Sequence, residues 1–190
     1  MKEIARLGGL LMLVTVIAAT GLAGVYSVTK PRIEAQKALE LERALTIALP
    51  GYDREQIDAK TRDDEVLYYA AAPAPGQKAT AYCFVSEGAG YSGIIETMVG
   101  IDSSGTILGM KILSQTETPG LGTKIEEIRY GESDPWFQRQ FIGRQAGLLS
   151  VDKDGGEIQS ITGATISSRT VTRSIVERYH GLKEVLQGSR

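Results

Sequence analysis

The residues from Leu7 to Thr29 contain no charged side chain, and this run constrains the fold of the chain more than any other feature. A helix of roughly 20 apolar residues crosses the ~30 Å hydrocarbon core of a bilayer. We therefore predict that residues 1–29 comprise a short N-terminus and a transmembrane helix in the lipid bilayer. A cleaved secretory signal peptide is the alternative, because Lys2 and Arg6 precede the run and small residues follow its most apolar part. The length of the run favours a retained anchor.

The rest of the 190-residue chain is long enough for one domain with its own core. Interleaved apolar and charged residues predict a connecting helix within residues 30–52, which Pro50-Gly51 ends. Residues 53–190 are then expected to form one α+β domain with a mainly antiparallel sheet and flanking helices. The net charge of -2 and the lack of a basic stripe argue against a nucleic-acid partner. Basic residues lie on both sides of the apolar run, so charge alone does not set its orientation.

A hairpin is the strongest β prediction within the domain, because apolar runs over Ile94–Ile101 and Thr106–Leu113 flank the turn residues Asp102-Ser103-Ser104-Gly105. Apolar residues three and four apart predict an amphipathic C-terminal helix. The residues of its apolar stripe are Val171, Ile175, Tyr179, Leu182 and Leu186. The other expected elements are strands over Val66–Ala72, Ala79–Val85, Leu148–Val151 and Ile158–Ile161, short helices over Gly122–Arg129 and from Asp134, an exposed turn or short helix over Asp53–Asp64, and a turn at Ala74-Pro75-Gly76.

The segment Thr162-Gly163-Ala164-Thr165-Ile166-Ser167-Ser168 lies where that last helix begins, and it has the chemistry of a phosphate site. Glycine lets the backbone approach an anion closely, and the first turn of a helix presents unpaired N–H groups with a partial positive charge. Several hydroxyl groups surround this cradle. On the residues alone, a helix N-cap formed by Thr162 or Thr165 explains the same pattern.

A second motif, Gln115-Thr116-Glu117-Thr118-Pro119-Gly120-Leu121-Gly122, follows the predicted hairpin. Its Pro-Gly-Leu-Gly core predicts a compact loop whose backbone amides can face a planar or anionic ligand. A type II turn that binds no ligand is the alternative, because Pro119 and Gly120 occupy the positions that this turn prefers.

Together with Gly90-Tyr91-Ser92-Gly93, these two motifs stand in the order found in FMN-binding domains of bacterial respiratory complexes. The whole chain resembles the G subunits of Rnf electron-transport complexes. A related family comprises the C subunits of the sodium-translocating NADH:quinone oxidoreductase, which have the same anchor and flavin domain but usually a longer chain. Residues 159–165 also resemble the Asp-x-x-Ser/Thr-Gly-Ala-Thr pattern that flavin transferases recognise, with Gln159 standing where the pattern has an acid.

The resemblance implies that Thr165 carries FMN through a phosphoester and that a flavin transferase attaches it. The other cofactor-binding residues that it implies are Thr162, Gly163, Ala164, Ser167 and Ser168 around the phosphate, and Glu117, Thr118, Gly120, Leu121 and Gly122 beside the isoalloxazine ring. It implies no catalytic residue and no metal ligand, because the flavin itself carries the electrons.

The resemblance also implies an electron-relay subunit of an ion-translocating ferredoxin:NAD oxidoreductase complex. Such a subunit would assemble with other Rnf subunits in the bacterial cytoplasmic membrane, with its flavin domain outside the cytoplasm. Two alternatives stay open. The chain could be an extracytoplasmic module that binds FMN reversibly, or a structural assembly subunit without a redox role.

Other reactive side chains are expected to be structural. Cys83 is the single cysteine and lies in an apolar run, which indicates a buried and inert thiol. His180 has no partner nearby in the sequence, so a surface position on the last helix is favoured over metal binding. Asp152, Asp154 and Glu157 lack the full ligand series of a calcium loop, which favours a solvated turn.

Overall fold

The computed structural model describes residues 2–62, 65–74 and 76–188. The chain divides into two compact units, Met1–Glu40 and Leu41–Arg190. The first unit is part of helix α1 (Lys2–Ala48), whose last turns, from Leu41, belong to the second unit. The predicted boundaries at residues 29 and 52 stay predictions.

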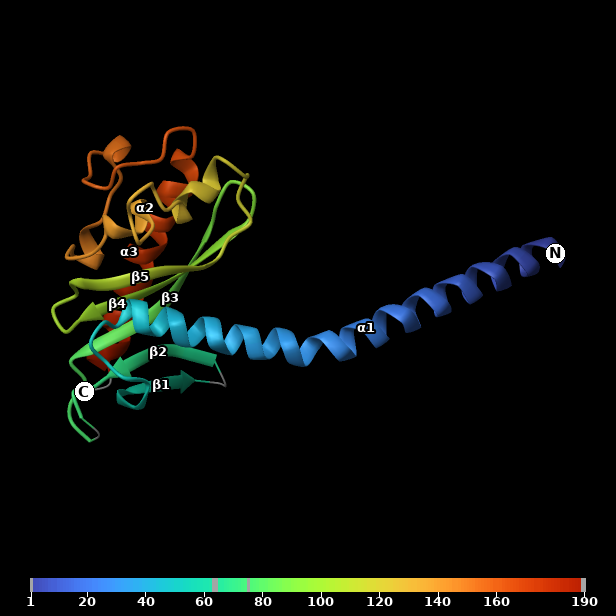
Figure 1. Ribbon diagram of the computed structural model, residues 1–190, viewed down its shortest axis with the longest axis horizontal. Coiled ribbons are helices and arrows are strands. Elements are labelled where there is room, and N and C mark those ends of the chain that lie inside the picture. Colours follow the sequence, from blue (N-terminus) through green and yellow to red (C-terminus); the bar gives the residue numbers. More distant parts are fainter. Residues whose placement is uncertain (1, 63–64, 75, 189–190) are drawn as a thin grey trace. The chain divides into compact units, whose positions relative to one another are not determined.

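Helix α1 runs without interruption for 47 residues and has Pro31 inside it. The sequence suggests two helices on either side of this proline, but the structure shows one (Figure 1). Within the described residues, α1 is the one helix long and apolar enough to cross a membrane, and the side chains of its apolar stretch are exposed. Its composition is therefore that of a membrane span or an N-terminal signal sequence.

The second unit is built around one antiparallel sheet with the strand order β1-β2-β3-β4-β5 (Figure 1). The sheet and its flanking helices confirm the predicted α+β class. The strands are β1 (Ile57–Arg62), β2 (Glu65–Ala71), β3 (Ala81–Ala89), β4 (Ile94–Asp102) and β5 (Ile107–Ser114). The predicted hairpin is confirmed, because β4 pairs with β5 in register from Glu96 opposite Ser114 to Ile101 opposite Ile107.

Strand β1 is the main element that the sequence does not reveal. The prediction of an exposed turn or short helix over Asp53–Asp64 is wrong for the described part, residues 53–62, apart from a short 3-10 helix at Arg54–Gln56. Asp64 and Pro75, which belong to predicted turns, lie outside the described residues. Every side chain of β1 after Ile57 is exposed, since this strand lies at the edge of the sheet. Charged residues do stand at every second position of β1, but only Ile57 is buried, so the run lacks the apolar face by which a half-buried strand is recognised.

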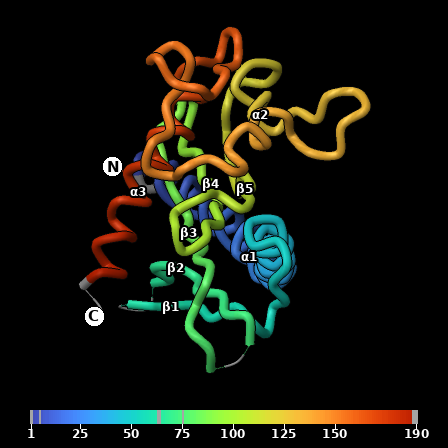
Figure 2. The backbone as a smooth tube through the Cα atoms, turned by 90° about the vertical axis from the view of Figure 1, so that its left-hand side faces the viewer, coloured from blue at the N-terminus to red at the C-terminus, as the bar shows by residue number. Residues whose placement is uncertain are grey.

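The sheet buries a different core on each face. On one face, Phe84, Val99 and Ile112 pack with Val171 and Ile175 of helix α3 (Thr165–Gly188). Figure 2 shows α3 on one side of strands β3 and β4 and the end of α1 on the other. The predicted C-terminal helix and its apolar stripe are thereby confirmed.

The other face of the sheet is covered by the last turns of α1, through buried Leu45 and Leu49. The backbone approaches so closely here that a side-chain carbon at Gly100 or Gly109 would collide with the carbonyl oxygens of Ala48 and Ile47. Cys83 is fully buried in this core, and burial raises the pKa of its thiol. The expectation of an inert thiol is consistent with both observations.

Between β5 and α3 the chain is mostly irregular. The predicted strands Leu148–Val151 and Ile158–Ile161 are wrong, because the two segments share one parallel bridge, between Val151 and Ile158, and no ladder. Each run is too short to extend the pairing beyond the turn that joins them. The short elements in this region are the 3-10 helices η2 (Gly122–Glu126), η3 (Ala146–Leu148) and η4 (Asp152–Asp154), and the single-turn helix α2 (Trp136–Arg139).

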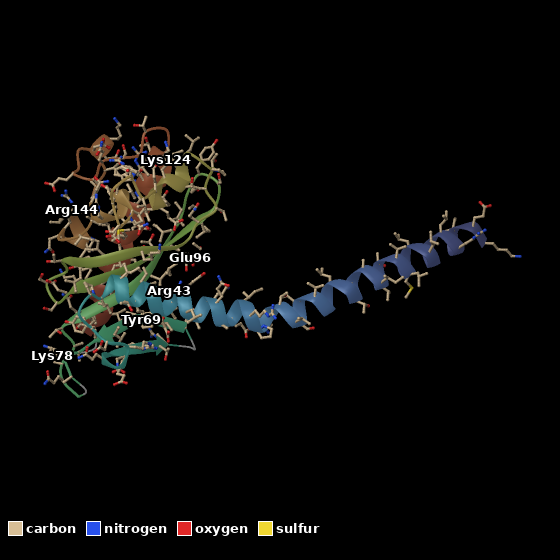
Figure 3. All side chains as sticks on the ribbon, viewed as in Figure 1. Arg43, Tyr69, Lys78, Glu96, Lys124 and Arg144 are labelled. Atoms are coloured by element: carbon tan, nitrogen blue, oxygen red, sulfur yellow. The ribbon has the colours of Figure 1, made fainter. Side chains whose placement is uncertain are left out.

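Acidic and basic side chains are spread over the second unit, as Figure 3 shows for Lys78, Glu96, Lys124 and Arg144. His180 is exposed on α3, and its ring makes an edge contact with Tyr179.

Candidate functional site

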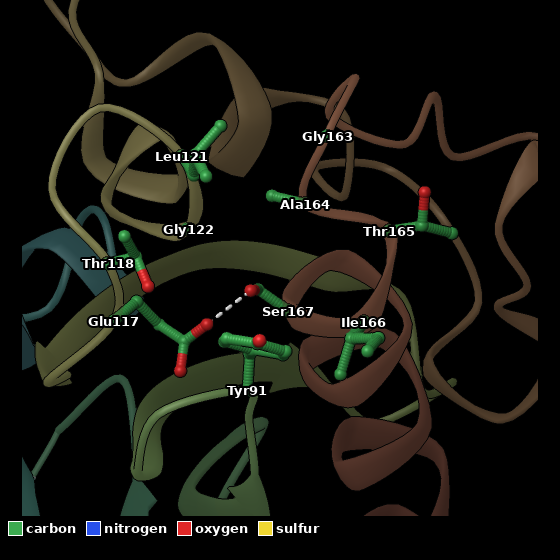
Figure 4. A pocket seen from close by; sticks show the side chains of 10 residues that line it. All are labelled: Tyr91, Glu117, Thr118, Leu121, Gly122, Gly163, Ala164, Thr165, Ile166 and Ser167. Carbon is green, nitrogen blue, oxygen red and sulfur yellow. Dashed lines mark hydrogen bonds between the residues drawn. The ribbon is translucent and has the colours of Figure 1, made fainter.

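A cavity of about 690 Å³ lies between the loop that follows β5 and the start of α3 (Figure 4). This volume falls within the range of about 300–1,000 Å³ typical of small-molecule sites. The residues that line it are Tyr91, Glu117, Thr118, Leu121, Gly122, Gly163, Ala164, Thr165, Ile166 and Ser167. The structure therefore brings together segments of the three motifs that the sequence singled out.

The start of α3 presents free hydrogen-bond donors to this cavity. The carbonyl of Ala164 accepts the N–H of Ser168 at 3.1 Å, and Gly163 adopts a left-handed conformation with φ of 80°. In the described part of the chain, the N–H groups of Thr165, Ile166 and Ser167 have no acceptor outside the helix. Unpaired donors at the first turn of a long helix favour an anion there.

The hydroxyl of Thr165 is available for chemistry. Thr165 is half-buried, lines the cavity and has no side-chain hydrogen bond among the described residues. Thr162 also lacks such a bond, but it is exposed and does not line the cavity. The structure therefore separates the two threonines that the sequence offers as equivalent caps.

The two serines that follow are occupied by protein partners. Ser168 is buried, accepts the N–H of Ile161 at 3.0 Å and donates its proton to the carbonyl of Ala164 at 3.0 Å. Ser167 is also buried and donates to the carboxylate of Glu117. Neither hydroxyl directs its proton toward a ligand in this geometry. Ser168 closes the first turn of α3 instead.

Glu117 is a buried carboxylate at the wall of the cavity and is 4% exposed. Besides Ser167, it accepts the backbone N–H of Ser92 at 2.9 Å. Two glycines make room for it, because a side-chain carbon at Gly90 or Gly122 would lie 2.5 Å from one of its oxygens. Glu117 thus joins the Gly90–Gly93 turn, its own loop and helix α3.

Burial raises the pKa of Glu117, but several hydrogen bonds act in the opposite direction. The donors are the hydroxyl of Ser167 and the backbone groups of Ser92, Tyr91 and Gly93. Their combined effect holds the pKa below its ordinary value of 4.5. Glu117 is therefore an ionised group at neutral pH.

The loop over residues 118–121 is a type II turn that also forms one wall of the cavity. The N–H of Leu121 donates to the carbonyl of Thr118 at 3.1 Å, and Gly120 has φ of 75°. A side-chain carbon at Gly163 would lie 3.2 Å from Cδ2 of Leu121, so the turn directly faces the start of α3. Gly120 itself is not part of the lining. The predicted type II turn is therefore present and also lines the cavity, while its contact with a ligand stays a prediction.

The segment before α3 is fastened from outside the cavity. Arg169 forms a two-point ion pair with Asp154, with both N···O distances 2.7 Å. An oxygen of Asp152 accepts the N–H of Ser160 at 3.1 Å. Hydrogen bonds from Ser160 lower the pKa of Asp152, and those from Arg169 lower the pKa of Asp154. These carboxylates therefore hold the segment that ends at Thr165.

Two lining residues, Tyr91 and Ile166, were not predicted as site residues. The side chain of Tyr91 is 71% exposed at the mouth of the cavity, and that of Ile166 is 49% exposed. Both lie inside motifs that the sequence does single out. Their apolar character favours contact with a planar ligand, but an aromatic residue in a turn and an isoleucine in a helix carry no such signal alone.

Two family models match the chain one after the other. The RnfG N-terminal region matches residues 1–46, and the FMN-binding domain matches residues 90–179. The G subunit of an ion-translocating oxidoreductase complex from Methanosarcina acetivorans is 31% identical over 92% of this chain and 92% of that protein. This chain belongs to the RnfG family. Another RnfG relative, the G subunit of the ion-translocating oxidoreductase complex from Cereibacter sphaeroides, is 38% identical over 88% of this chain and 79% of that protein.

A solved structure is also similar to this member of the RnfG family. It is the C subunit of the Na(+)-translocating NADH-quinone reductase from Parabacteroides distasonis, with 28% sequence identity and a TM-score of 0.46. The match covers 58% of this chain and 57% of that one. Every residue that lines the cavity lies inside the matched FMN-binding domain.

The cavity fits the flavin that this RnfG domain implies. Free N–H groups at the start of α3 suit a phosphate, and Leu121, Ile166 and Tyr91 supply apolar surface for a ring. Thr165, whose hydroxyl is free, lies at the start of α3 beside Ile166 (Figure 4).

Proposed function

We propose that this chain is a membrane-anchored flavoprotein subunit of an Rnf complex and carries FMN covalently on Thr165. The observation that supports it most is the position of Thr165, a lining residue of the cavity at the start of α3, whose hydroxyl has no hydrogen-bond partner among the described residues and whose N–H is unpaired. Attachment forms a bond between Oγ1 of Thr165 and the FMN phosphorus of a flavin dinucleotide, breaks the pyrophosphate bond of that donor, and releases a nucleoside monophosphate together with the hydroxyl proton. A flavin transferase catalyses this step.

The residues of the chain then bind and orient the cofactor. The N–H groups of Thr165, Ile166 and Ser167 hold the phosphate, and the turn over residues 118–122 provides a wall for the ring. Ser167 and Ser168 act indirectly, because their protons hold Glu117 and close the first turn of α3. The flavin supplies the electron chemistry and relays electrons between partners, so no side chain has to act on a substrate.

The proposal also assigns a place in the membrane. Residues 1–29 form the anchor, residues 30–52 connect it, and residues 53–190 form the flavin domain together with the last turns of α1 that pack on the sheet. Relatives named as subunits of ion-translocating oxidoreductase complexes support assembly with other Rnf subunits. We place the flavin domain outside the cytoplasm of a bacterial cell, and the complex in its cytoplasmic membrane.

Coexpression of the full chain with a flavin transferase tests the covalent link. After denaturing electrophoresis, flavin fluorescence should travel with the polypeptide, disappear in Thr165→Ala and persist in the control variant Ser103→Ala, whose side chain is exposed and does not line the cavity. Flavin that binds natively but leaves on denaturation would instead support a reversible module. A chain that holds no flavin in either state would favour a purely structural subunit.

A further inference from the structure

Glu117 is the one ionisable carboxylate among the ten described residues that line the cavity, and those residues include no lysine or arginine. It lies across the cavity from Thr165 (Figure 4). The end of the site that would hold the phosphate therefore presents N–H donors, while a different part of the wall contains a negative charge.

Both carboxylate oxygens of Glu117 are bound by neutral donors of the protein. One oxygen accepts the N–H of Ser92 at 2.9 Å, and the other accepts the hydroxyl of Ser167. Glu117 is therefore held in place at the wall of the cavity, and its charge has a fixed position.

No formal positive charge balances Glu117 in the described structure. Its donors are neutral hydroxyl and amide groups, and none of its interactions involves a lysine or arginine. A charge that is 4% exposed is screened by solvent much less than one on the surface. Its field therefore reaches the interior of the cavity.

We infer that Glu117 is a fixed negative charge that lowers the reduction potential of a flavin held in the cavity. This inference rests on the proposed function. Reduction by an external donor moves electrons onto the ring, and a nearby negative charge disfavours this gain of electron density. Glu117 is a positioning residue, since it also holds Ser167 and the Tyr91–Gly93 turn in place.

Redox titration of the full chain with bound FMN, in detergent and with dithionite as reductant, tests this inference. Glu117→Gln keeps the shape of the side chain but removes its charge, so its midpoint potential should be higher than that of the wild type. Glu117→Asp keeps the charge and should restore a low potential. Ser103→Ala serves as the matched control, with a potential equal to the wild type, because Ser103 is exposed and does not line the cavity.

A second pair of variants tests the inference if Glu117→Gln does not fold. Ser92 is exposed and binds Glu117 through its backbone N–H, so a lysine at this position adds a positive charge to the turn that holds Glu117. Lysine and glutamine both remove the Ser92 hydroxyl, which lies 3.2 Å from the hydroxyl of Thr118, so the pair differs chiefly in charge. Ser92→Lys should raise the potential, and the neutral Ser92→Gln should not. Unchanged potentials in both Glu117→Gln and Ser92→Lys would overturn the inference. A wild-type chain without flavin would contradict the proposed function instead.

Discussion

Removal of the Ser167 hydroxyl should destabilise the second unit, because it takes a donor from a buried carboxylate. Ser167 is 1% exposed and Glu117 is 4% exposed, so water replaces the lost hydrogen bond poorly. Hydrogen bonds to charged groups contribute about 1.5–3 kcal/mol. We therefore expect Ser167→Ala to lower the free energy of unfolding by about 2 kcal/mol. With a urea m-value of about 2 kcal/mol per M, the unfolding midpoint shifts by about 1 M.

Trp136 provides the signal for this measurement. It is the single tryptophan of the chain and is 8% exposed, so its fluorescence reports unfolding of the second unit. The full chain in detergent is titrated with urea, with Ser103→Ala as control, because the side chain of Ser103 is exposed and has no hydrogen bond among the described residues. A double-mutant cycle of Ser167→Ala with Glu117→Gln isolates the pair. Strictly additive effects of the two substitutions would refute the reasoning.

The same variant should respond to pH in a defined direction. The pKa of Glu117 lies below its ordinary value of 4.5 in the fold, so its ionised form stabilises the fold at higher pH. This stability is lost as the pH falls through the lowered pKa. The difference between wild type and Ser167→Ala should therefore be constant at neutral pH and shrink as the pH falls through the folded-state pKa of Glu117 in the two proteins. A difference that stays constant at every pH at which both proteins fold would contradict an ionised Glu117 that Ser167 stabilises.

Four further outcomes are expected. Thr165→Ser keeps a hydroxyl, so denatured chains should retain flavin fluorescence at a reduced yield, whereas Thr165→Val should lose it. Gly100→Ala forces the end of α1 away from β4 at the carbonyl of Ala48 and should lower the free energy of unfolding by about 1–3 kcal/mol in urea titration. Gln159→Asp should speed flavin attachment in a time course with the transferase and leave the unfolding midpoint unchanged. Alkaline phosphatase fused to the C-terminus should be active if the domain lies outside the cytoplasm, and an inactive, intact fusion would contradict that topology.

The sequence predicts those parts of the fold whose cause is local. The hairpin of β4 and β5 follows from two apolar runs and a turn, and α3 follows from one apolar stripe. Strand β1 has only a weak local signature, because only Ile57 of its side chains is buried and its pairing with β2 comes from the sheet. The failure at Leu148–Val151 is the reverse case, since Val151 is buried without a strand around it while Leu148 is exposed.

In the candidate site too, features with a local cause are predictable from the sequence, and features that depend on packing are not. Thr165 and the turn before Gly122 are recognisable from sequence because their motifs require particular backbone conformations. The pairing of Ser167 with Glu117 is not, since the two residues are 50 positions apart and meet only when α3 packs on the sheet. Position 90 likewise requires glycine, because a side-chain carbon there would lie 2.5 Å from an oxygen of Glu117.

The side chain of Gln159 does not contribute to the geometry of the site, so its identity concerns only recognition by a flavin transferase. Its backbone N–H donates to the side-chain oxygen of Gln140 at 2.8 Å, and its carbonyl accepts from the same amide at 3.2 Å. Its own side chain is exposed and has no hydrogen bond in the described structure. An acid at this position would therefore alter neither the cavity nor the first turn of α3. On the proposed function, the departure from the transferase pattern would affect how quickly Thr165 is modified, while Glu117, Gly122 and the start of α3 set the shape of the cavity.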